Sequence, residues 1–578
     1  MTQISGAQLL IRFLEGRGVT TIAGIPGGAA LPIYDALHGS SITHILARHE
    51  QGAGFIAQGM ARATGVPAVT LATSGPGATN LVTAVADAYA DSIPLLAITG
   101  QVPQHLIGTD AFQEVDACHL FEKITRKSFF ARSAEELYEI LPKAWLLMTQ
   151  GRPGPVHVDI PKDVQLQKVE FRPFRFIAPS AHTADAAAIE LAARMIGASE
   201  RPVFYIGGGI IASGAAEVVT TLARDQGIPV VSSVMGLGAF PAKDELFLGM
   251  LGMHAAPYTN YIMHEADLLI AVGVRFDDRA TGKLEKFCPG ARVIHIDIDA
   301  RELGKLRQPQ LAIEADARVA LKGLALALPA PRVRSAWLQR IAELRAAHPH
   351  EETADDNAAI AFMQLLDRSR SLDDFITTDV GQHQMWAAQY LQFDRPRRWL
   401  TSGGLGTMGF GLPAAIGASL ATGQRSICIS GDGSVMMNLQ ELQTLAELAL
   451  PVKIIILDNG HLGLVRQQQT LFFDKRLSAS AFLQPTGFTA IAAAFGLPAM
   501  TVDATDSAGL QAFLAMPGPG VAHVPIRAAD KVLPMVAPGA GNLEMILRDP
   551  ERQRTAETNR VAGAKPLDGA ALVSTVRP

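Results

Sequence analysis

The chain has few cysteines, and none of them pairs with another at metal-binding spacing. Cys118, Cys288 and Cys428 lie far apart among 578 residues, and there is no CxxC motif. Zinc sites built on cysteine need closely spaced ligands, so the sequence argues against one. The low count also fits a reducing compartment, and we expect a cytoplasmic protein.

Long apolar runs and long basic runs are also missing. No apolar stretch approaches the roughly 20 residues that a membrane-spanning helix requires. The net charge is −5, with basic residues spread along the chain, so neither a membrane nor a nucleic acid is an expected partner. The opening MTQISGAQLLIRFLEGRG predicts an amphipathic helix capped by Ser5 rather than a signal peptide.

Short apolar segments bounded by glycine or proline recur along the chain in three sets. The 48% hydrophobic and 18% charged composition suits large buried parallel sheets. The sets are TIAGIP, THILA, AVTLATS, LLAITG and GPVHVDI; PVFYIGGG, PVVSS, LLIAVGV and RVIHIDID; and ITTDVG, RSICISGDG, VKIIILDN and VAHVPI. Helical segments lie between them, which predicts an α/β protein with three doubly wound parallel-sheet domains. We place these domains at residues 1–165, 186–330 and 359–545, and a loose tail at 546–578.

One motif in the third set predicts a cation site. Asp432 lies between two glycines, and Asn459 follows 27 residues later at the end of the next apolar segment. Carboxylate and amide oxygens suit Mg²⁺, which shares its ligands with a bound diphosphate. Flanking glycines allow backbone N–H groups to approach phosphate oxygens at a helix start. The alternative is an ordinary turn with an aspartate cap.

A second candidate is Glu50, at the start of the helical segment EQGAGFIAQGMARATG. A carboxylate in the first turn of a helix is favoured by the helix dipole, which is the structural alternative. The residues that follow are small or apolar, however, and such surroundings favour a carboxyl group that holds or shares a proton near neutrality.

These motifs resemble the acetohydroxyacid synthase (acetolactate synthase) large-subunit family of thiamine diphosphate (ThDP) enzymes. The resemblance runs from residue 3 to about residue 545. It is carried by RHEQGA around Glu50, TSGPGATN with Pro76 and Asn80, DVGQHQMW with Gln382 and His383, GGLGTMGFG with Met408, and the GDG…N motif.

The resemblance implies an activity and a set of cofactor contacts. Such an enzyme decarboxylates pyruvate on ThDP and transfers the hydroxyethyl unit to a second pyruvate or to 2-oxobutyrate, in branched-chain amino acid biosynthesis. Glu50 would hydrogen-bond the aminopyrimidine ring and start proton removal from the thiazolium. Met408 would be the wedge that bends the cofactor. The His461 carbonyl would join Asp432 and Asn459 on Mg²⁺. The remaining ThDP contacts implied are Pro76, Asn80, Gln382, His383, Gly406, Gly433 and Ser434.

Six further residues resemble those that bind and select the substrates: Gly28, Phe112, Gln113, Lys162, Arg279 and Gln468. Phe112 and Gln113 lie at the positions where decarboxylases of the wider superfamily carry two histidines. The absence of these histidines removes a proton source for the carbanion intermediate, which favours its attack on a second 2-oxo acid over release of an aldehyde. Lys162 and Arg279 are cations that can steer a carboxylate, although a surface ion pair explains either one alone.

Gln468 departs from the family, which usually has tryptophan there, and no tryptophan follows Trp399. A tryptophan would favour the extra methylene of 2-oxobutyrate, and one methylene in a pocket contributes about 1–3 kcal/mol. We therefore expect acetolactate as the main product, with weak preference for 2-oxobutyrate.

The middle set resembles the FAD-binding part of the family. FAD is held there without net redox in the main reaction, and the RFDDRATG segment distinguishes this chain from catabolic relatives that lack FAD. The residues implied are Arg152, Gly207, Gly208, Met235, Met253, Asp297 and Asp316.

The family places its active site between two subunits, so at least a homodimer, or a tetramer, is implied, and members also join a small regulatory subunit. Three alternatives stay open. Another ThDP enzyme, a glyoxylate carboligase or a pyruvate oxidase, is the nearest, and a non-catalytic nucleotide-binding scaffold is a second. The GLGTMG segment at 404–409 also matches a dinucleotide-binding pattern, but the glycines beside Asp432 and the spaced Asn459 disfavour NAD.

Overall fold

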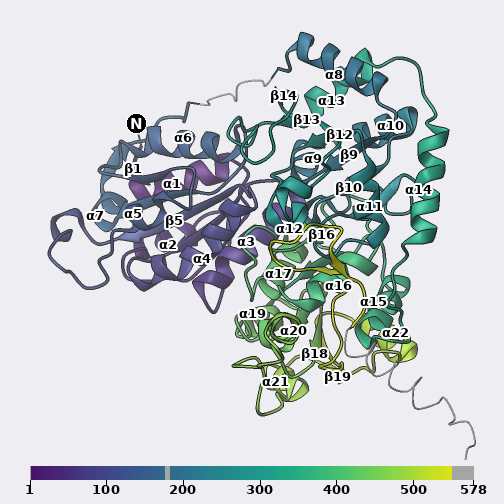
Figure 1. Cartoon of the computed structure of the whole chain (residues 1–578). Helices are drawn as coiled ribbons and strands as arrows, with labels where there is room; N and C mark the ends of the chain where they lie inside the picture. Colours follow the sequence, from purple (N-terminus) through teal and green to yellow (C-terminus); the bar gives the residue numbers. More distant parts are fainter. Residues whose placement is uncertain (1, 176–182, 550–578) are drawn as a thin grey trace, which may run out of the picture.

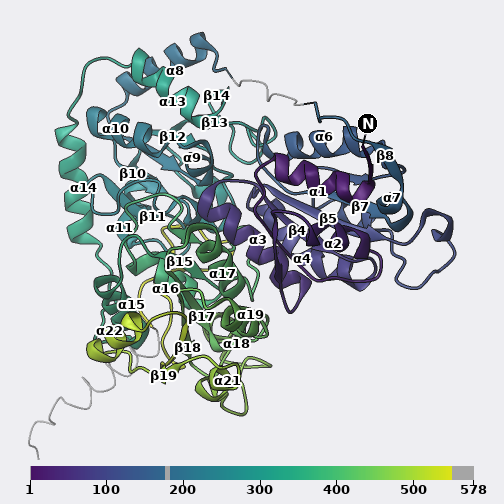
Figure 2. The ribbon, with the colours of Figure 1, turned by 180° about the vertical axis from the view of Figure 1, so that it is seen from behind.

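A computed structural model describes residues 2–175 and 183–549, which form three six-stranded sheets with helices on both faces (Figure 1). All strand pairs within these three sheets are parallel. The predicted fold class is therefore confirmed. The first unit lies to one side of the other two, and the view from behind shows the same arrangement (Figure 2).

The first sheet has the order β3-β2-β4-β5-β7-β6. Its strands are β2 (Thr21–Gly24), β3 (Thr43–Leu46), β4 (Ala68–Ala72), β5 (Leu95–Gln101), β6 (Ser128–Phe130) and β7 (Val156–Pro161). Its helices are α1 (Gly6–Gly16), α2 (Leu31–His38), α3 (Glu50–Thr64), α4 (Pro76–Ala90), α5 (Ala117–Glu122), α6 (Leu137–Thr149) and α7 (Lys162–Leu166). The predicted first helix begins as expected, with a capping box between Ser5 and Gln8. A short pair, β1 (Gln3–Ser5) with β8 (Lys168–Glu170), joins the two ends of this unit.

The third sheet repeats this topology, with the order β16-β15-β17-β18-β20-β19. Its strands are β15 (Phe375–Thr378), β16 (Trp399–Leu400), β17 (Ser426–Gly431), β18 (Val452–Asp458), β19 (Ala499–Thr501) and β20 (Gly520–Pro525). Its helices are α15 (Ala358–Ser369), α16 (Gln382–Tyr390), α17 (Gly411–Thr422), α18 (Asp432–Val435), α19 (Glu441–Leu448), α20 (Gly463–Phe472), α21 (Phe488–Ala494) and α22 (Ser507–Ala515). In both sheets the strand order reverses between the first and third strands of the sequence. Doubly wound folds bind ligands at this point, beyond the carboxyl ends of the strands.

The central sheet has a different order, β11-β10-β9-β12-β13-β14. Its strands are β9 (Pro202–Ile206), β10 (Val230–Ser232), β11 (Phe247–Met250), β12 (Leu268–Val272), β13 (Arg292–Asp297) and β14 (Leu311–Glu314). Its helices are α8 (Ala186–Ala198), α9 (Gly208–Ser213), α10 (Ala216–Gln226), α11 (Pro257–Glu265), α12 (Asp278–Thr281) and α13 (Ala317–Ala327), and α14 (Ser335–Ala347) leads to the third unit. This strand order is that of dinucleotide-binding folds.

The first and third units meet through α3 and α17, which lie side by side in both views. Glycines make this contact close. A side chain at Gly59 would overlap the Ala414 backbone, and one at Gly417 would overlap the Ile56 backbone. Almost every residue of α3 is buried, including Glu50, the first residue of the helix.

The segment after the third sheet packs back onto the protein. It forms the small sheet of β21 (Met535–Val536) and β22 (Met545–Ile546), and Asp549 pairs with Lys531 at 2.6 Å. Most of the tail predicted at 546–578 lies outside the described residues. Across the described ranges, no helix is long and apolar enough to cross a bilayer.

Candidate functional site

The residues predicted to contact ThDP, Mg²⁺ or substrate in the first and third units share one position in the fold, after the carboxyl end of a parallel strand. In the first sheet, Gly28 follows β2, Glu50 follows β3, Pro76 and Asn80 follow β4, Phe112 and Gln113 follow β5, and Lys162 follows β7. In the third sheet, Gln382 and His383 follow β15, Gly406 and Met408 follow β16, Asp432, Gly433 and Ser434 follow β17, and Asn459, His461 and Gln468 follow β18. Parallel strands bring these positions to one edge of each sheet, which is where such folds bind ligands.

Glu50 is a buried carboxylate held by a neighbouring amide. The residue is 9% exposed, and Asn80 Nδ2 donates to Glu50 Oε2 at 2.9 Å. The predicted residues Glu50 and Asn80 therefore meet, although they are 30 positions apart. No sequence pattern pointed to Tyr34, whose hydroxyl is buried without a partner among the described residues; burial, and then the Glu50 charge, raise its pKa.

Asp432 and Asn459 converge at the ends of neighbouring strands β17 and β18. Asp432 Oδ2 and Asn459 Oδ1 both accept from the His461 backbone N–H, at 3.2 and 3.0 Å. Burial and the neighbouring Asp458 carboxylate raise the pKa of Asp432, so a cation here would relieve an unfavourable negative charge. The described residues contain no cluster of three His, Cys, Asp or Glu side chains suited to a metal, and a site of one carboxylate, one amide and one backbone carbonyl does not need one.

Gln382 and His383 lie beside this pair at the start of α16. Asn459 Nδ2 donates to Gln382 Oε1 at 3.0 Å, so the Gln382 side chain touches a predicted metal ligand. The His383 Nε2 atom is buried with no partner within residues 2–175 and 183–549, which leaves a hydrogen bond for a phosphate oxygen. Burial lowers the pKa of His383 to about 3, so the ring is neutral, and the tautomer with its proton on Nε2 can donate to a phosphate oxygen. These features fit a Mg-diphosphate group.

Sequence reasoning missed Gln467, the buried neighbour of Gln468 on α20. Its Oε1 accepts from Gln382 Nε2 at 2.9 Å and from the Val532 backbone N–H at 2.8 Å. It thereby ties Gln382 to the segment after β20. Gln468 itself is partly exposed on the same helix, as a pocket-lining residue requires.

The residues predicted to contact substrate in the first unit are at least partly exposed or next to open space. Phe112 is 88% exposed, and Gln113 has a left-handed backbone at φ 62°. Gly28 faces open space, with no neighbouring atom within 4 Å of the point where a side chain would begin. Lys162 begins α7 and is half-buried.

Two further predicted residues lie together in the central unit. Met253 and Arg279 line a small cavity of about 90 Å³ with residues 536–539 and Asn542. The segment after the third sheet therefore closes one side of this cavity, next to the cation predicted to steer a carboxylate.

The residues implied for flavin lie mainly at the carboxyl edge of the central sheet. Gly207 and Gly208 follow β9 at the point where the strand order reverses, and Met235 follows β10. Asp297 ends β13, and burial raises its pKa to about 6. Glycines at a switch point and a carboxylate at a strand end suit a dinucleotide, so these residues fit FAD.

Arg152 and Asp316 have structural partners as well. Arg152 precedes β7 and pairs with Glu302 at 2.7 Å and with Asp299 at 3.5 Å, which joins the first and central units. Asp316 caps α13 by accepting from the Arg318 and Val319 N–H groups. Flavin contacts for these two residues stay predictions.

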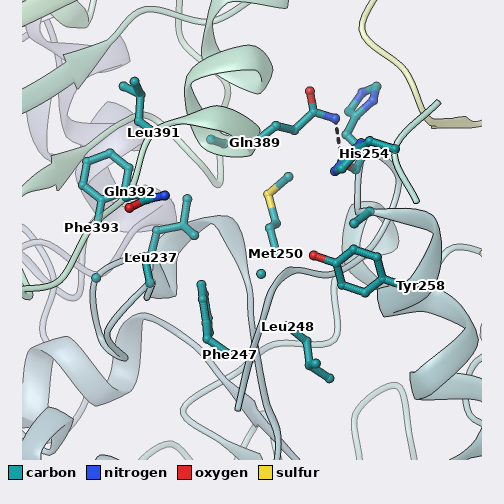
Figure 3. Close-up of a pocket in the computed structure, with 16 residues that line it drawn as sticks. Leu237, Phe247, Leu248, Met250, His254, Tyr258, Gln389, Leu391, Gln392 and Phe393 are labelled. Carbon is teal, nitrogen blue, oxygen red and sulfur yellow. Dashed lines mark hydrogen bonds between the residues drawn. The ribbon is translucent and has the colours of Figure 1, made fainter. Parts of the chain in front are cut away.

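A larger cavity of about 250 Å³ lies between the central and third units, away from the predicted residues (Figure 3). Leu237, Phe247 and Met250 line it from the central unit, and Gln389 and Phe393 line it from the third. Gln389 Nε2 donates to the His254 carbonyl at 2.9 Å. None of the predicted site residues lines this space.

A buried polar network supports the loop that carries Phe112 and Gln113. Asp159 accepts from Thr99 Oγ1 at 2.6 Å and from Gln101 Nε2 at 3.0 Å, and Gln101 Nε2 also donates to the Val115 carbonyl at 2.7 Å. Burial raises the pKa of Asp159 from 3.8 to about 7.

This network predicts a pH dependence of stability. Between about pH 4 and pH 7 the folded protein keeps a proton on Asp159 that the unfolded chain releases, so the free energy of unfolding falls as pH rises through this window. Asp159→Asn should flatten that fall. The measurement is the thermal midpoint at several pH values, with exposed Asp163→Asn as the control. Equal pH slopes for wild type and Asp159→Asn would contradict the prediction.

Three protein-family models match the chain. The thiamine pyrophosphate enzyme N-terminal TPP binding domain matches residues 4–120, the central domain matches 189–324, and the C-terminal TPP binding domain matches 379–524. Together with the three sheets and the residues at their carboxyl edges, these matches define a thiamine diphosphate enzyme.

Curated relatives narrow the class. The chain is 50% identical to the acetolactate synthase isozyme 1 large subunit of Escherichia coli, over 94% of this chain and 98% of the relative. It is 44% identical to a probable acetolactate synthase large subunit of Methanocaldococcus jannaschii, over 94% and 95%, and 44% identical to the chloroplastic acetolactate synthase 1 of Nicotiana tabacum, over 94% and 84%. The chain belongs to the acetolactate synthase large-subunit family.

Proposed function

We propose that the chain decarboxylates pyruvate and joins the remaining two-carbon unit to a second pyruvate or to 2-oxobutyrate, with ThDP, Mg²⁺ and FAD as cofactors. The observation that carries the proposal is the buried Glu50 carboxylate, fixed by Asn80 at the carboxyl edge of the first sheet. Family membership supports the substrate class, and the step serves branched-chain amino acid biosynthesis.

The third unit would hold the charged end of the cofactor. Asp432, Asn459 and the His461 carbonyl would bind Mg²⁺, while Gln382, His383, Gly433 and Ser434 would contact the diphosphate. The start of α18 presents backbone N–H groups to the same place, which favours phosphate oxygens. Gly406 and Met408 would lie against the thiazolium.

The first unit would control the proton. When bound, ThDP supplies the carbon nucleophile that attacks the 2-oxo acid. Glu50 would hold a proton against the pyrimidine ring nitrogen, and Asn80 would keep the Glu50 carboxylate in place. Pro76 would lie against the same ring. A buried site suits this role because it excludes water, which competes for the proton.

Substrate contacts would come from residues on two units. Gly28 would offer a backbone N–H to the reacting carbonyl, Gln113 and Lys162 would lie close to the reacting atoms, and Phe112 would cover them. Arg279, 62% exposed on its side chain, would bind the carboxylate of the second 2-oxo acid through its planar guanidinium.

Gln468 should set the substrate preference, and Gln468→Trp tests this. The indole would add apolar contact to the methyl group by which 2-oxobutyrate exceeds pyruvate, worth about 1–3 kcal/mol, or about 10–200-fold in preference. Competition between the two 2-oxo acids, with both products quantified, measures the change. Gln468→Leu controls for simple loss of polarity. A wild-type enzyme that already makes chiefly acetohydroxybutyrate would refute the prediction.

We further propose that the active site is completed by a second copy of the chain, in a homodimer or tetramer. Within one chain, the loop before Met408 contacts Asp87 near the end of α4, whereas Pro76 begins that helix. At 1.5 Å per residue, 11 residues separate these ends by about 16 Å. The carboxyl edges also expose large apolar side chains, Leu46 and Phe112 on the first unit and Met437 and Phe482 on the third. A symmetric partner would cover them and bring the two half-sites together.

Two further points extend the proposal. Three free cysteines without CxxC spacing support a cytoplasmic location. Membership of a family of large subunits supports a small regulatory subunit as partner.

The direct test is acetolactate formation by the purified chain, with each cofactor omitted in turn. We expect product only when ThDP and Mg²⁺ are both present, and no net reduction of FAD during turnover. Bleaching of the flavin by pyruvate at the turnover rate would instead support a pyruvate oxidase, and absence of CO₂ release would support a non-catalytic scaffold.

A further inference from the structure

The loop that leads to Met408 is held by two carboxylates of the first unit. The Asp91 side chain accepts from the Gly403 N–H at 3.0 Å and from the Gly404 N–H at 2.7 Å. Asp87 accepts from the hydroxyls of Ser402 and Thr407, the latter at 3.2 Å. Both carboxylates come from the C-terminal end of α4, so a first-unit helix fixes a third-unit loop.

A single buried cation shares these carboxylates. The Arg62 guanidinium lies 3.0 Å from Asp87 and 2.9 Å from Asp91, and the three side chains are 5%, 0% and 0% exposed. Arg62 also donates to the Thr401 carbonyl at 2.9 Å. One positive and two negative groups leave a carboxylate without full charge compensation, and burial raises the pKa of Asp87.

The loop supplies hydrogen bonds that stabilise the carboxylate charge which Arg62 leaves uncompensated. Buried charge is costly unless it is hydrogen-bonded, and hydrogen bonds to charged groups are about twice as strong as neutral ones. The hydrogen bonds from two backbone N–H groups and two hydroxyls of residues 402–407 therefore stabilise this conformation of the loop. Other conformations of the loop would leave Asp91 buried without them.

The other side of Met408 is fixed as well. Gly409 adopts φ 87°, and its carbonyl accepts from Asn438 Nδ2 at 2.8 Å. Met408 thus lies between two fixed points, the contacts of residues 402–407 with α4 and the contact of Gly409 with Asn438 near α19. These contacts restrict the backbone on both sides of Met408.

We propose that Asp91, together with Asp87 and Arg62, is a positioning residue for ThDP, because it holds the 402–407 loop in the conformation that presents Met408 to the cofactor. This inference rests on the proposed function, in which Met408 lies against the bound cofactor. Asp91 itself touches neither substrate nor cofactor.

The test is ThDP binding to the full chain by titration calorimetry at saturating Mg²⁺, for wild type, Asp91→Asn and Asp91→Ala. Asparagine keeps one acceptor and alanine keeps none, so the dissociation constant should rise in that order, by about tenfold for alanine. In the same proteins without ThDP, hydrogen exchange of the Gly403 and Gly404 amides should accelerate by a similar factor.

A matched control is Asp394→Ala. Asp394 also accepts a backbone N–H across a unit boundary, from Ala242 at 3.0 Å, but it lies away from the Met408 loop. ThDP affinity should stay at the wild-type value in this variant. If Asp91→Ala fails to fold, Thr407→Val removes only the hydroxyl bound to Asp87 and should weaken ThDP binding by a smaller factor.

The outcomes distinguish the positioning role from the proposed function. A wild-type chain that does not bind ThDP overturns the proposed function, and the positioning role with it. A wild-type chain that binds ThDP, beside an Asp91→Ala variant with equal affinity and unchanged amide exchange, overturns the positioning role alone.

Discussion

Glu50→Gln should bind ThDP with near wild-type affinity and yet lose most of its activity. The amide keeps the size of the side chain and its contact with Asn80, but it cannot exchange a proton with the pyrimidine ring. Proton transfer by a positioned group contributes typically about 10²–10⁴-fold to a rate, so kcat should fall within that range. Calorimetry gives the cofactor affinity, and a colorimetric acetoin assay gives the rate.

The control is Glu15→Gln, in the same unit. Glu15 accepts from the Ser41 N–H at 2.8 Å, away from the strand ends that form the site. Its activity should stay close to wild type. A Glu50→Gln enzyme that keeps wild-type turnover would remove the carboxylate from the mechanism, whatever its cofactor affinity.

Asp432→Ala should abolish ThDP binding at Mg²⁺ concentrations that saturate the wild type. The substitution leaves Asn459 as the only side-chain ligand proposed for Mg²⁺, and Mg²⁺ binds poorly without a carboxylate ligand. Asp373→Asn is the matched control, because Asp373 pairs with Arg395 just before the start of β15, at the opposite edge of the same sheet, and its loss should leave binding unchanged. Titration of apo-protein with Mg²⁺ and ThDP measures both.

The two inactive variants can also locate the site. If each site joins the first unit of one subunit to the third unit of its partner, a hybrid of Glu50→Gln and Asp432→Ala subunits contains one intact site and one doubly altered site. Random mixing then restores about one quarter of wild-type activity, since half the dimers are hybrids with half their sites intact. If both half-sites belonged to the same chain, mixing would restore nothing.

Most of the fold could be predicted from sequence because its central strands are apolar throughout. LLIAV in β12 and AVTLA in β4 are buried along their whole length, as strands covered on both faces must be. Within the three large sheets, the strands that were not predicted, β6, β11, β14 and β19, all lie at sheet edges. Edge strands are short and half-covered, so their composition resembles that of loops.

The part of the site that lies in sequence motifs could be predicted from the motifs and their spacing. Asp432 and Asn459 lie on neighbouring strands, as the 27-residue interval indicated, and Glu50 begins its helix as expected. The supporting side chains could not be found in this way. Gln467 lies in a run of three glutamines with no feature to single it out, and Asp87 and Asp91 contact a loop more than 300 positions away. Only the tertiary structure reveals such partners.

The glycine contact between α3 and α17 limits the positions at which substitutions can change the shape of the proposed active site. Glu50 begins α3, and Met408 lies three residues before the start of α17. Because neither Gly59 nor Gly417 can gain a side chain without pushing the helices apart, this contact fixes the first unit against the third within each chain. It thereby links the proposed acid of one site to the proposed wedge of the other site in the dimer. We therefore expect accommodation of bulkier 2-oxo acids to arise in the Phe112 loop and in α20, where exchange of side chains leaves the α3–α17 contact untouched.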